Sequence, residues 1–380
     1  MMERYPILRA GRTEGSIRTF PDFIEVTREG TEHYYLWSVG RGVRLLPQYT
    51  NVVRNWYEPG LGVIGYTAYD IEAYVETLLR ELRDHLKGKR VLVDFSGGKD
   101  SVATLALLQM LSESLDFKVY AGYVHMPFLE PPENLDFAEY AAERLGAEFV
   151  MVEAERKIMR FYLESTGLPK RGRRWCTYLK IRGLRRIKKI VRPHYEAKGD
   201  RLLEAGKRLR RLYHYLRSRK FLDGTKLNVV YPLTILDVVN LVRRVGLTHP
   251  QYLAGIPRVS CKYCPYKSLY ELEASEGFEV EDEGYVEYVA RREYQRIYSL
   301  TLEWDEFWSQ HLWRFSPTPS SMLASLRAQH PPSDTMDLEE ARSLFSSLWT
   351  EPLPDAEKLS LEGIMEVALL SLEGDRASSV

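Results

Sequence analysis

The chain has 380 residues, of which 44% are hydrophobic and 28% are charged, as in ordinary globular proteins and unlike disordered or fibrous ones. Its 53 basic and 53 acidic side chains cancel, so the net charge alone indicates no particular partner. Three cysteines are too few for a disulfide framework, and the length suits one large domain with additions or two to three domains.

The first residues lack the apolar run of an export signal. No stretch approaches the roughly 18 to 20 uninterrupted apolar residues of a membrane helix. We therefore expect a cytoplasmic location and no membrane contact.

Residues 1–66 are rich in turns and aromatic side chains, with short β-like runs at 23–26 and 34–37. They predict a small β-rich N-terminal module in which we identify no chemistry. From 70 to 86 apolar residues recur at helical spacing, and Gly88 ends the expected helix.

Strands and helices alternate in the next part of the chain. Strands are expected at 91–95, 119–125 and 149–152, and helices from the loop after residue 95 to about 113 and over 135–145. This alternation predicts an α/β fold with a doubly wound parallel sheet covered on both faces.

The remainder is expected to be largely helical. It contains a basic helical stretch, a strand at 228–231, a helix at 235–245 and helices from Cys264 to Trp313. A linker rich in Ser and Pro at 316–321 precedes an acidic helical tail. We therefore predict three parts: a β-rich module at 1–66, a nucleotide-binding domain at 67–275, and a helical region with an acidic tail at 276–380.

Charge is distributed unevenly along the chain. Residues 170–220 contain twenty Lys or Arg and three acids, and residues 331–380 contain eleven acids and three bases. Such asymmetry favours a polyanionic partner such as nucleic acid. The alternative is a set of solvated helix faces, neutralised in part by the tail.

A candidate phosphate-binding loop follows the strand at 91–95. Its residues are Ser96, Gly97, Gly98, Lys99, Asp100 and Ser101. Paired glycines allow a tight turn and a close approach to an anion, and the first N–H groups of the following helix have no partner within it. Lys99 adds a positive charge, and Asp100 supplies a carboxylate of the kind that holds Mg²⁺. A tight turn with a serine cap is the simpler alternative, but the full order of residues favours a phosphate site.

This loop is not of the Walker type, because Val93 stands where that pattern requires glycine. It resembles the PP-loop of the ATP pyrophosphatase superfamily, whose signature is SGGKDS. The resemblance implies a doubly wound parallel sheet of the adenine nucleotide alpha hydrolase-like kind and binding of ATP or a related adenylyl nucleotide. Such enzymes commonly cleave ATP to AMP and pyrophosphate, and adenylation turns a substrate oxygen into a good leaving group.

The three cysteines lie in two basic contexts, Cys176 in one and the C-x-x-C pair Cys261 and Cys264 in the other. Basic neighbours favour thiolate, which is the reactive and metal-binding form. Buried inert thiols and a redox pair are alternatives. Three soft thiolates with an open fourth position suit an iron–sulfur cluster, or zinc completed by another ligand such as His249.

Three segments together resemble the phosphoadenosine phosphosulfate (PAPS) reductase-like branch of the superfamily, over about residues 88–270. They are RWCTYLK at 174–180, the stretch at 232–238, and GIPRVSCKYCPY at 255–266. Residues 199–211 are loosely similar to the family's arginine-containing loop at the phosphate or sulfate end of the nucleotide. We expect His125 to join the loop in binding the nucleotide. The residues expected at the substrate phosphate are Arg171, Arg174, Lys180, Arg208 and Arg211.

Two departures separate the chain from sulfonucleotide reductases. Cluster-bearing adenylyl-sulfate (APS) reductases carry Cys-Cys where this chain has Trp175-Cys176, so a four-cysteine cluster cannot form. These reductases also use a cysteine near the C-terminus, and none follows Cys264. A three-cysteine site is instead similar to that of cluster-dependent tRNA thiolation enzymes of the superfamily. This implies a [4Fe–4S] cluster, or zinc, on Cys176, Cys261 and Cys264.

We therefore predict a PP-loop enzyme in adenylation-linked sulfur transfer, with tRNA as a candidate substrate and a homodimer as a candidate assembly. Lys99, Asp100 and Cys176 are the expected catalytic residues. The first alternative is a PAPS or APS reductase, which would release sulfite from its nucleotide. The second is a non-catalytic nucleotide- or nucleic-acid-binding protein.

Overall fold

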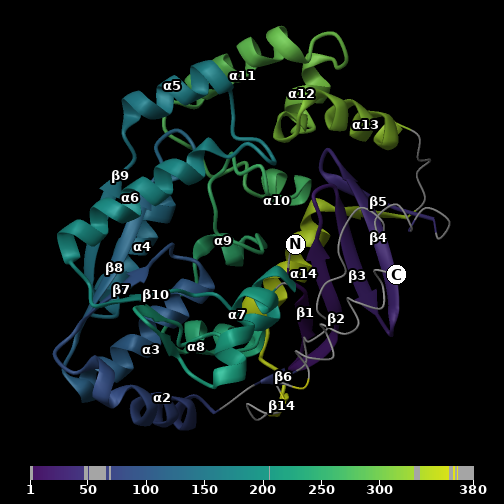
Figure 1. The fold of residues 1–380 in the computed structure, drawn as a ribbon. Coiled ribbons are helices and arrows are strands. Elements are labelled where there is room, and N and C mark those ends of the chain that lie inside the picture. The colour runs from purple at the N-terminus through teal and green to yellow at the C-terminus, as the bar shows by residue number, and fades with distance from the viewer. Residues whose placement is uncertain are drawn as a thin grey trace.

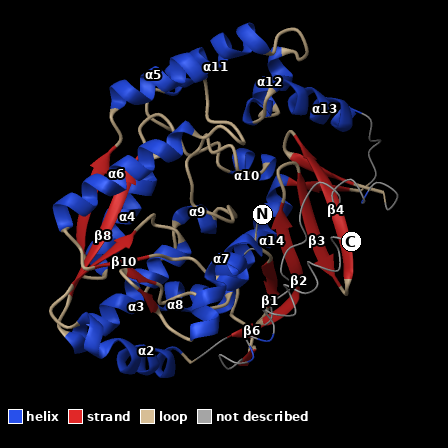
Figure 2. Cartoon of the chain, in the orientation of Figure 1, coloured by secondary structure: helices blue, strands red, loops and turns tan. Residues whose placement is uncertain are grey.

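A computed structural model describes residues 3–46, 66–67, 70–204, 206–328 and 334–358, together with Thr50, Gly363 and Glu366. It contains a six-stranded antiparallel sheet and a six-stranded, mostly parallel sheet (Figures 1 and 2). The antiparallel sheet has the order β1 (Tyr5–Arg9), β2 (Arg12–Thr19), β3 (Phe23–Arg28), β4 (Thr31–Ser38), β5 (Arg41–Arg44) and β13 (Thr335–Asp337). The predicted β-rich N-terminal part is therefore present, and a strand from far along the chain joins its edge.

The second sheet carries the predicted parallel strands. Its order is β11 (Leu222–Asp223), β12 (Lys226–Leu227), β10 (Tyr195–Ala197), β7 (Arg90–Asp94), β8 (Lys118–His125) and β9 (Glu148–Glu153). All neighbouring pairs are parallel except β11 with β12. A short parallel pair, β6 (Tyr66–Thr67) and β14 (Glu357–Lys358), stands apart from both sheets.

The three central residues of β7 are apolar because both faces of the strand are covered. Val91 and Val93 belong to one hydrophobic core and Leu92 to another, as the alternation of side chains along a strand requires. The first core contains residues of α2 (Ile71–Leu86), α3 (Lys99–Leu115), α4 (Pro132–Arg144) and α8 (Ile235–Arg244). The second contains residues of α6 (Trp175–Val191). The predicted doubly wound α/β fold is confirmed.

The rest of the described chain is largely helical, as predicted, apart from β13 and β14. Its elements are α5 (Arg156–Thr166), α7 (Gly206–Ser218), α9 (Pro250–Leu253), α10 (Leu269–Ala274), α11 (Glu283–Ile297), α12 (Trp304–Ser309), α13 (Pro317–Ala328), α14 (Leu338–Thr350) and the 3₁₀ turns Leu202–Glu204 and Leu312–Arg314. None of the helices in these described ranges is both long and apolar enough to cross a membrane. How the chain divides into domains stays a prediction.

Two local predictions were wrong. Residues 228–231 are a buried turn and not a strand, because the Val229 carbonyl accepts from the Tyr74 hydroxyl and the Tyr231 carbonyl from the Leu202 amide. Burial alone accounts for this apolar run. The predicted linker at 316–321 begins α13, whose first residue is Pro317, a position that proline favours.

The helix of the acidic tail is also part of the fold. Helix α14 contacts β1, α8 and α9, and Figure 1 shows it between the two sheets. Its Phe345, Leu348 and Trp349 are buried. The part of the acidic tail in this helix is therefore packed against the fold.

Candidate functional site

The loop from β7 to α3 has the conformation that its glycines allow. Gly97 has φ +70°, in the left-handed region, and Gly98 is the extended residue that precedes α3. The Ser101 hydroxyl donates to the Gly98 carbonyl at 2.9 Å and lies 3.1 Å from the Ser96 hydroxyl. The two serines therefore hold the turn closed.

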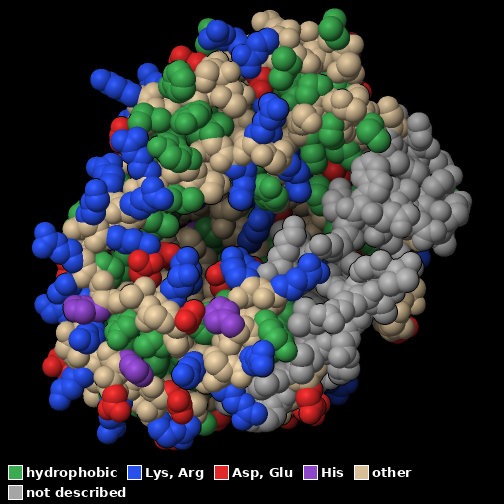
Figure 3. All heavy atoms as spheres, in the orientation of Figure 1, with side chains coloured by type: hydrophobic (Ala, Val, Ile, Leu, Met, Phe, Trp, Pro, Cys, Tyr) green, Lys and Arg blue, Asp and Glu red, His purple; other side chains and the backbone are tan. Residues whose placement is uncertain are grey.

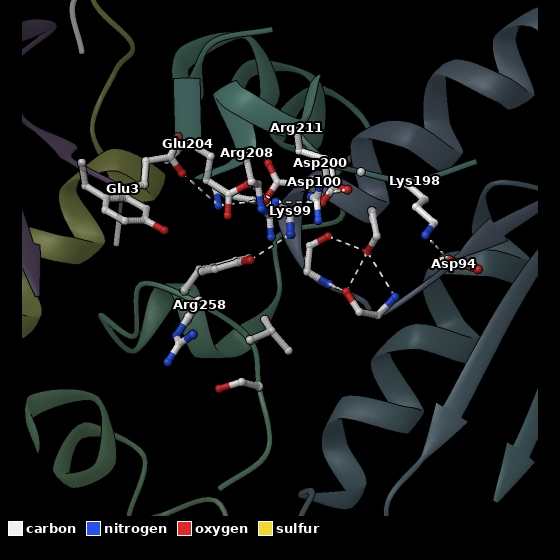
Figure 4. Close-up of a pocket in the computed structure, with 18 residues that line it drawn as sticks. Glu3, Asp94, Lys99, Asp100, Lys198, Asp200, Glu204, Arg208, Arg211 and Arg258 are labelled. Atoms are coloured by element: carbon white, nitrogen blue, oxygen red, sulfur yellow. Dashed lines mark hydrogen bonds and ion pairs between the residues drawn. The ribbon is translucent and has the colours of Figure 1, made fainter. Parts of the chain in front are cut away.

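This loop forms the floor of a cleft of about 530 Å³ at the carboxyl ends of β7 and β10 (Figure 4). In parallel sheets this is the edge at which ligands bind. The lining residues come from four parts of the chain: Glu3 and Tyr5; Asp94, Ser96 and Gly98 to Ser101; Lys198 to Asp200, Glu204, Arg208 and Arg211; and Tyr252 with Arg258 to Ser260. Figure 3 shows Lys and Arg side chains around a hollow in this face of the molecule.

Lys99 and Asp100 lie in a buried charge network. The Lys99 ammonium is 3.0 Å from Asp100 and 3.3 Å from Glu3. The Arg201 guanidinium donates to the other Asp100 oxygen at 2.5 Å and to both Glu3 oxygens at 2.6 and 2.7 Å. Lys99 lines the cleft but is only 4% exposed, because these charged groups surround it.

The network shifts the pKa values of its members. Burial would raise the pKa of Asp100, but the charges of Arg201 and Lys99 lower it well below its usual range. Burial would lower the pKa of Lys99, but Asp100, Tyr5 and Glu3 raise it. Both groups are therefore charged at neutral pH.

Two other carboxyl groups of the cleft, those of Glu204 and Asp94, are less well stabilised in their charged forms. Burial, reinforced by Asp100, raises the pKa of Glu204 to about 7, although Arg208 forms an ion pair with it. Burial also raises the pKa of Asp94, whose nearest cation, Lys198, is 3.8 Å away. Glu204 can therefore change protonation near neutral pH.

Tyr252, from a distant part of the chain, contacts the loop at Lys99. Its hydroxyl accepts from the backbone N–H of Lys99 at 2.8 Å, and its ring stacks on Trp349 of α14 at 4.4 Å between centroids. Tyr5 of β1 donates to the Pro257 carbonyl at 2.5 Å. Tyr5 near the N-terminus and Trp349 of α14 therefore help to form a site whose sequence motif lies at residues 96–101.

The residues predicted to hold substrate phosphate divide into two groups. Arg208 and Arg211 line the cleft, where each forms an ion pair with Asp200, at 3.2 and 2.7 Å. Arg171 and Arg174 instead lie over the ring of Tyr266, at 4.9 and 4.5 Å from its centroid. Tyr266 lies two residues after Cys264, so the second group accompanies the cysteines.

Each of the three cysteines lies within electrostatic range of the fifth predicted residue, Lys180. Cys176 lies in the first turn of α6, and Cys261 and Cys264 lie in the loop before α10. As thiolates, Cys261, Cys176 and Cys264 would each raise the pKa of Lys180. We call Cys176, Cys261, Cys264 and Lys180 the thiol cluster.

The expectation that basic neighbours favour thiolate was wrong for Cys261 and Cys176. Burial raises the pKa of Cys261 to about 12 and also raises that of Cys176, although Lys180 opposes both changes. These thiols are therefore protonated at neutral pH. Nothing in the described ranges forms a group of three His, Cys, Asp or Glu side chains arranged to hold a metal ion. An iron–sulfur cluster or zinc ion on these cysteines stays a prediction.

His125 and His249 lie outside the lining of the cleft. His125 ends β8, and its Nδ1 atom is 3.6 Å from Glu130, whose charge raises the pKa of Lys180. Burial lowers the pKa of His249 to about 3, and its ring packs at 4.4 Å from that of Phe137. His125 therefore accompanies the thiol cluster, and its role in nucleotide binding stays a prediction.

Sequence reasoning missed Glu3, Tyr5, Tyr252 and Arg201. None lies in a recognisable motif except Arg201, which falls in the loosely matched segment at 199–211. The other three reach the loop only through the packing of distant segments, so no local signal could have identified them.

Comparison with known proteins agrees with this geometry. Residues 90–267 match the model of the phosphoadenosine phosphosulfate reductase domain. This part of the chain is therefore similar to that family. The matched residues contain the loop at 96–101, Arg208 and Arg211 of the cleft and the thiol cluster, while Glu3, Tyr5 and α14 lie outside them.

A curated relative is the uncharacterized protein MJ0066 of Methanocaldococcus jannaschii, 27% identical over 194 residues. The alignment covers 48% of this chain and 38% of the relative. The chain therefore matches well under half of that protein's length.

Two solved structures show weak similarity. The U34-tRNA thiolase NcsA of Methanococcus maripaludis, determined with its [4Fe–4S] cluster, has a TM-score of 0.40 and 16% identity, over 69% of this chain and 82% of that one. The NMN synthetase of Francisella tularensis has a TM-score of 0.33 and 10% identity, over 60% of this chain and 96% of that one. At these scores neither structure carries an argument about function.

Proposed function

We propose that the protein is an ATP-dependent PP-loop enzyme that adenylates its substrate and then replaces the activated oxygen with sulfur at the thiol cluster. The observation that carries the proposal is the continuity of the two sites. Arg258, Val259 and Ser260 line the phosphate cleft, and Cys261 is the next residue. A nucleotide anchored at Lys99 would therefore extend toward the cysteines.

The chemistry needs no net redox change. The substrate oxygen attacks the α-phosphorus of ATP, and the bond to the departing pyrophosphate breaks. A sulfur at the oxidation level of sulfide then displaces AMP from the activated carbon. The cations of the cleft offset the negative charge on pyrophosphate as it leaves, and a charged donor placed at such a group contributes strongly.

Asp94 is the carboxylate best suited to the expected Mg²⁺. Its Oδ1 atom is buried and has no hydrogen-bond partner among the described residues, whereas both oxygens of Asp100 are held by Lys99 and Arg201. Mg²⁺ needs only one or two carboxylates together with phosphate oxygens. The ion would neutralise phosphate charge and orient the reacting group.

A tRNA substrate is supported by the outer face of α6. Its exposed side chains are Tyr178, Ile181, Arg182, Arg185, Arg186, Lys189 and Ile190. Arg185, Arg186 and Lys189 have no ion-pair partner within the described ranges, and Figure 3 shows basic side chains along this side of the molecule. Because α6 begins beside Cys176, phosphates bound here would lie near the thiol cluster.

The test is to incubate the protein with ATP, Mg²⁺ and a sulfide source, with and without tRNA, and to measure AMP, pyrophosphate and thiolated nucleoside. We expect release of AMP and pyrophosphate that depends on tRNA. Sulfite release from PAPS without tRNA would favour a reductase, and nucleotide binding without turnover would favour a binding protein. Anaerobic purification with iron and zinc analysis tests the metal.

A further inference from the structure

The N-terminal segment reaches into the phosphate cleft. Tyr5 is anchored by its hydrogen bond to the Pro257 carbonyl and by an edge-to-face contact with Phe345 of α14, at 6.0 Å between centroids. Two residues before it, the Glu3 carboxylate enters the cleft and is 9% exposed. The position of this carboxylate is thus fixed by the packing of β1 against α14.

The Glu3 carboxylate lies between two cations. It accepts two hydrogen bonds from Arg201 and is 3.3 Å from the Lys99 ammonium. Carboxylate and phosphate oxygens are equivalent partners for a guanidinium and an ammonium. Glu3 therefore makes contacts of the kind that a ligand phosphate would make.

The Arg201 guanidinium keeps one unsatisfied hydrogen-bond donor in this arrangement. Its side chain is fully buried, and its Nη1 atom has no hydrogen-bond partner among the described residues. Buried polar groups without partners are rare and costly in folded proteins. An anion with more oxygens than a carboxylate would satisfy this group.

We propose that Glu3 is an internal anion that occupies the site of a ligand phosphate and sets the affinity of the cleft for polyphosphate. The inference rests on the proposed function, since it takes the cleft to bind the phosphates of a nucleotide. Lys99 and Arg201 already share two carboxylates, those of Glu3 and Asp100, and a phosphate added beside both would be strongly repelled in a site of low dielectric constant. Phosphate entry therefore displaces the Glu3 side chain, and Arg201 becomes a phosphate ligand.

The alternative is that Glu3 only neutralises two buried cations. Glu3→Gln separates the two, because the amide preserves the shape of the side chain and removes its charge. Glu25→Gln is the matched control. Glu25 is a buried carboxylate of the same sheet, paired with Arg18 at 2.6 Å and Arg4 at 2.9 Å, and it lies outside the cleft.

Calorimetry with inorganic pyrophosphate and Mg²⁺ tests the proposal on the full chain. We expect Glu3→Gln to bind pyrophosphate about tenfold more tightly than the unaltered protein, and Glu25→Gln to bind it equally well. Glu3→Asp, which keeps the charge, should bind as the unaltered protein does. Thermal melting verifies that each variant is folded.

Unchanged or weaker binding by folded Glu3→Gln would overturn the proposal. If Glu3→Gln does not fold, Glu3→Asp decides, because a shorter carboxylate that gives tighter binding would contradict a role set by charge. Lys99→Ala distinguishes failure of the proposal about Glu3 from failure of the proposed function. If that variant binds pyrophosphate normally, the phosphate site itself is wrong and the proposed function fails with it.

Discussion

The phosphate cleft and the thiol cluster share one edge of the parallel sheet but are built in opposite ways. In the cleft, Lys99 and Asp100 remain ionised because each has partners of opposite charge, as Asp100 has in Lys99 and Arg201. The thiol cluster assembles buried sulfurs around a single ammonium, and burial keeps Cys176 and Cys261 protonated. The cleft is therefore prepared to hold a charged ligand, whereas the cysteines need a further event, such as ligand or metal binding, to become thiolates.

The largest expected effect is that of Lys99→Ala, which attacks the cleft and spares the cysteines. Removing the ammonium should abolish nucleotide turnover, and binding should weaken by about 1.5 to 3 kcal/mol because a charged hydrogen bond to phosphate is lost. It should also destabilise the fold by about 3 kcal/mol, since Glu3 and Asp100 lose a buried partner.

Calorimetry with ATP and denaturant unfolding measure the two effects of Lys99→Ala. Lys118→Ala is the matched control, because Lys118 is exposed at the opposite end of the same sheet. Unchanged ATP affinity in the Lys99 variant would show that the cleft is not the nucleotide site.

Cys261→Ser alters the thiol cluster and leaves the phosphate cleft intact. Serine preserves the size of the side chain and removes the sulfur, so sulfur incorporation should fall at least about 100-fold while ATP affinity changes less than about twofold. Comparison of thiolated product with calorimetric ATP binding measures the separation. Equal losses in both would mean that the two sites are not chemically distinct.

Charge reversal on α6 tests whether nucleic acid reaches the thiol cluster. The double variant Arg185→Glu, Lys189→Glu should bind tRNA about tenfold or more weakly, and the slope of log affinity against log salt should fall by about 0.7 to 0.9 for each lost phosphate contact. Arg80→Glu, Arg83→Glu is the control, because these exposed residues lie on α2, across the sheet. Equal effects of both double variants would indicate a response to net charge alone.

The smallest expected effect is the pH dependence of anion binding. Glu204, with a pKa of about 7, takes up a proton as the pH falls through that value, and the cleft loses one negative charge. Pyrophosphate binding should therefore tighten by about threefold from pH 8 to pH 6. The free energy of unfolding should fall as the pH rises from the ordinary value of 4.5 toward about 7, since the folded state holds this proton more tightly.

Glu204→Gln should flatten both pH profiles, which calorimetry and denaturant unfolding record. A binding profile with the same slope in the variant would assign the pH dependence to protonation of the ligand and not to Glu204.

The sequence alone determined the elements whose signals are local. The helical spacing from 70 to 86 predicted α2, the apolar run at 91–95 predicted β7, and the contiguous motif at 96–101 predicted the phosphate loop. Their hydrogen bonds and turns depend on neighbouring residues, so a pattern of adjacent residue types suffices. The strand predicted at 228–231 was wrong because a run of apolar residues indicates burial but does not indicate which groups supply the hydrogen bonds.

Only the tertiary structure decided which side chains meet. It set Cys176 of α6 within electrostatic range of Cys261 and Cys264 in the loop before α10, which their separation in sequence leaves open. It brought Glu3 to Lys99 and Trp349 to Tyr252, pairs that are far apart in sequence. It also reversed the expected ionisation of the cysteines, because burial of a thiol depends on every segment packed around it and outweighs the charges of its sequence neighbours.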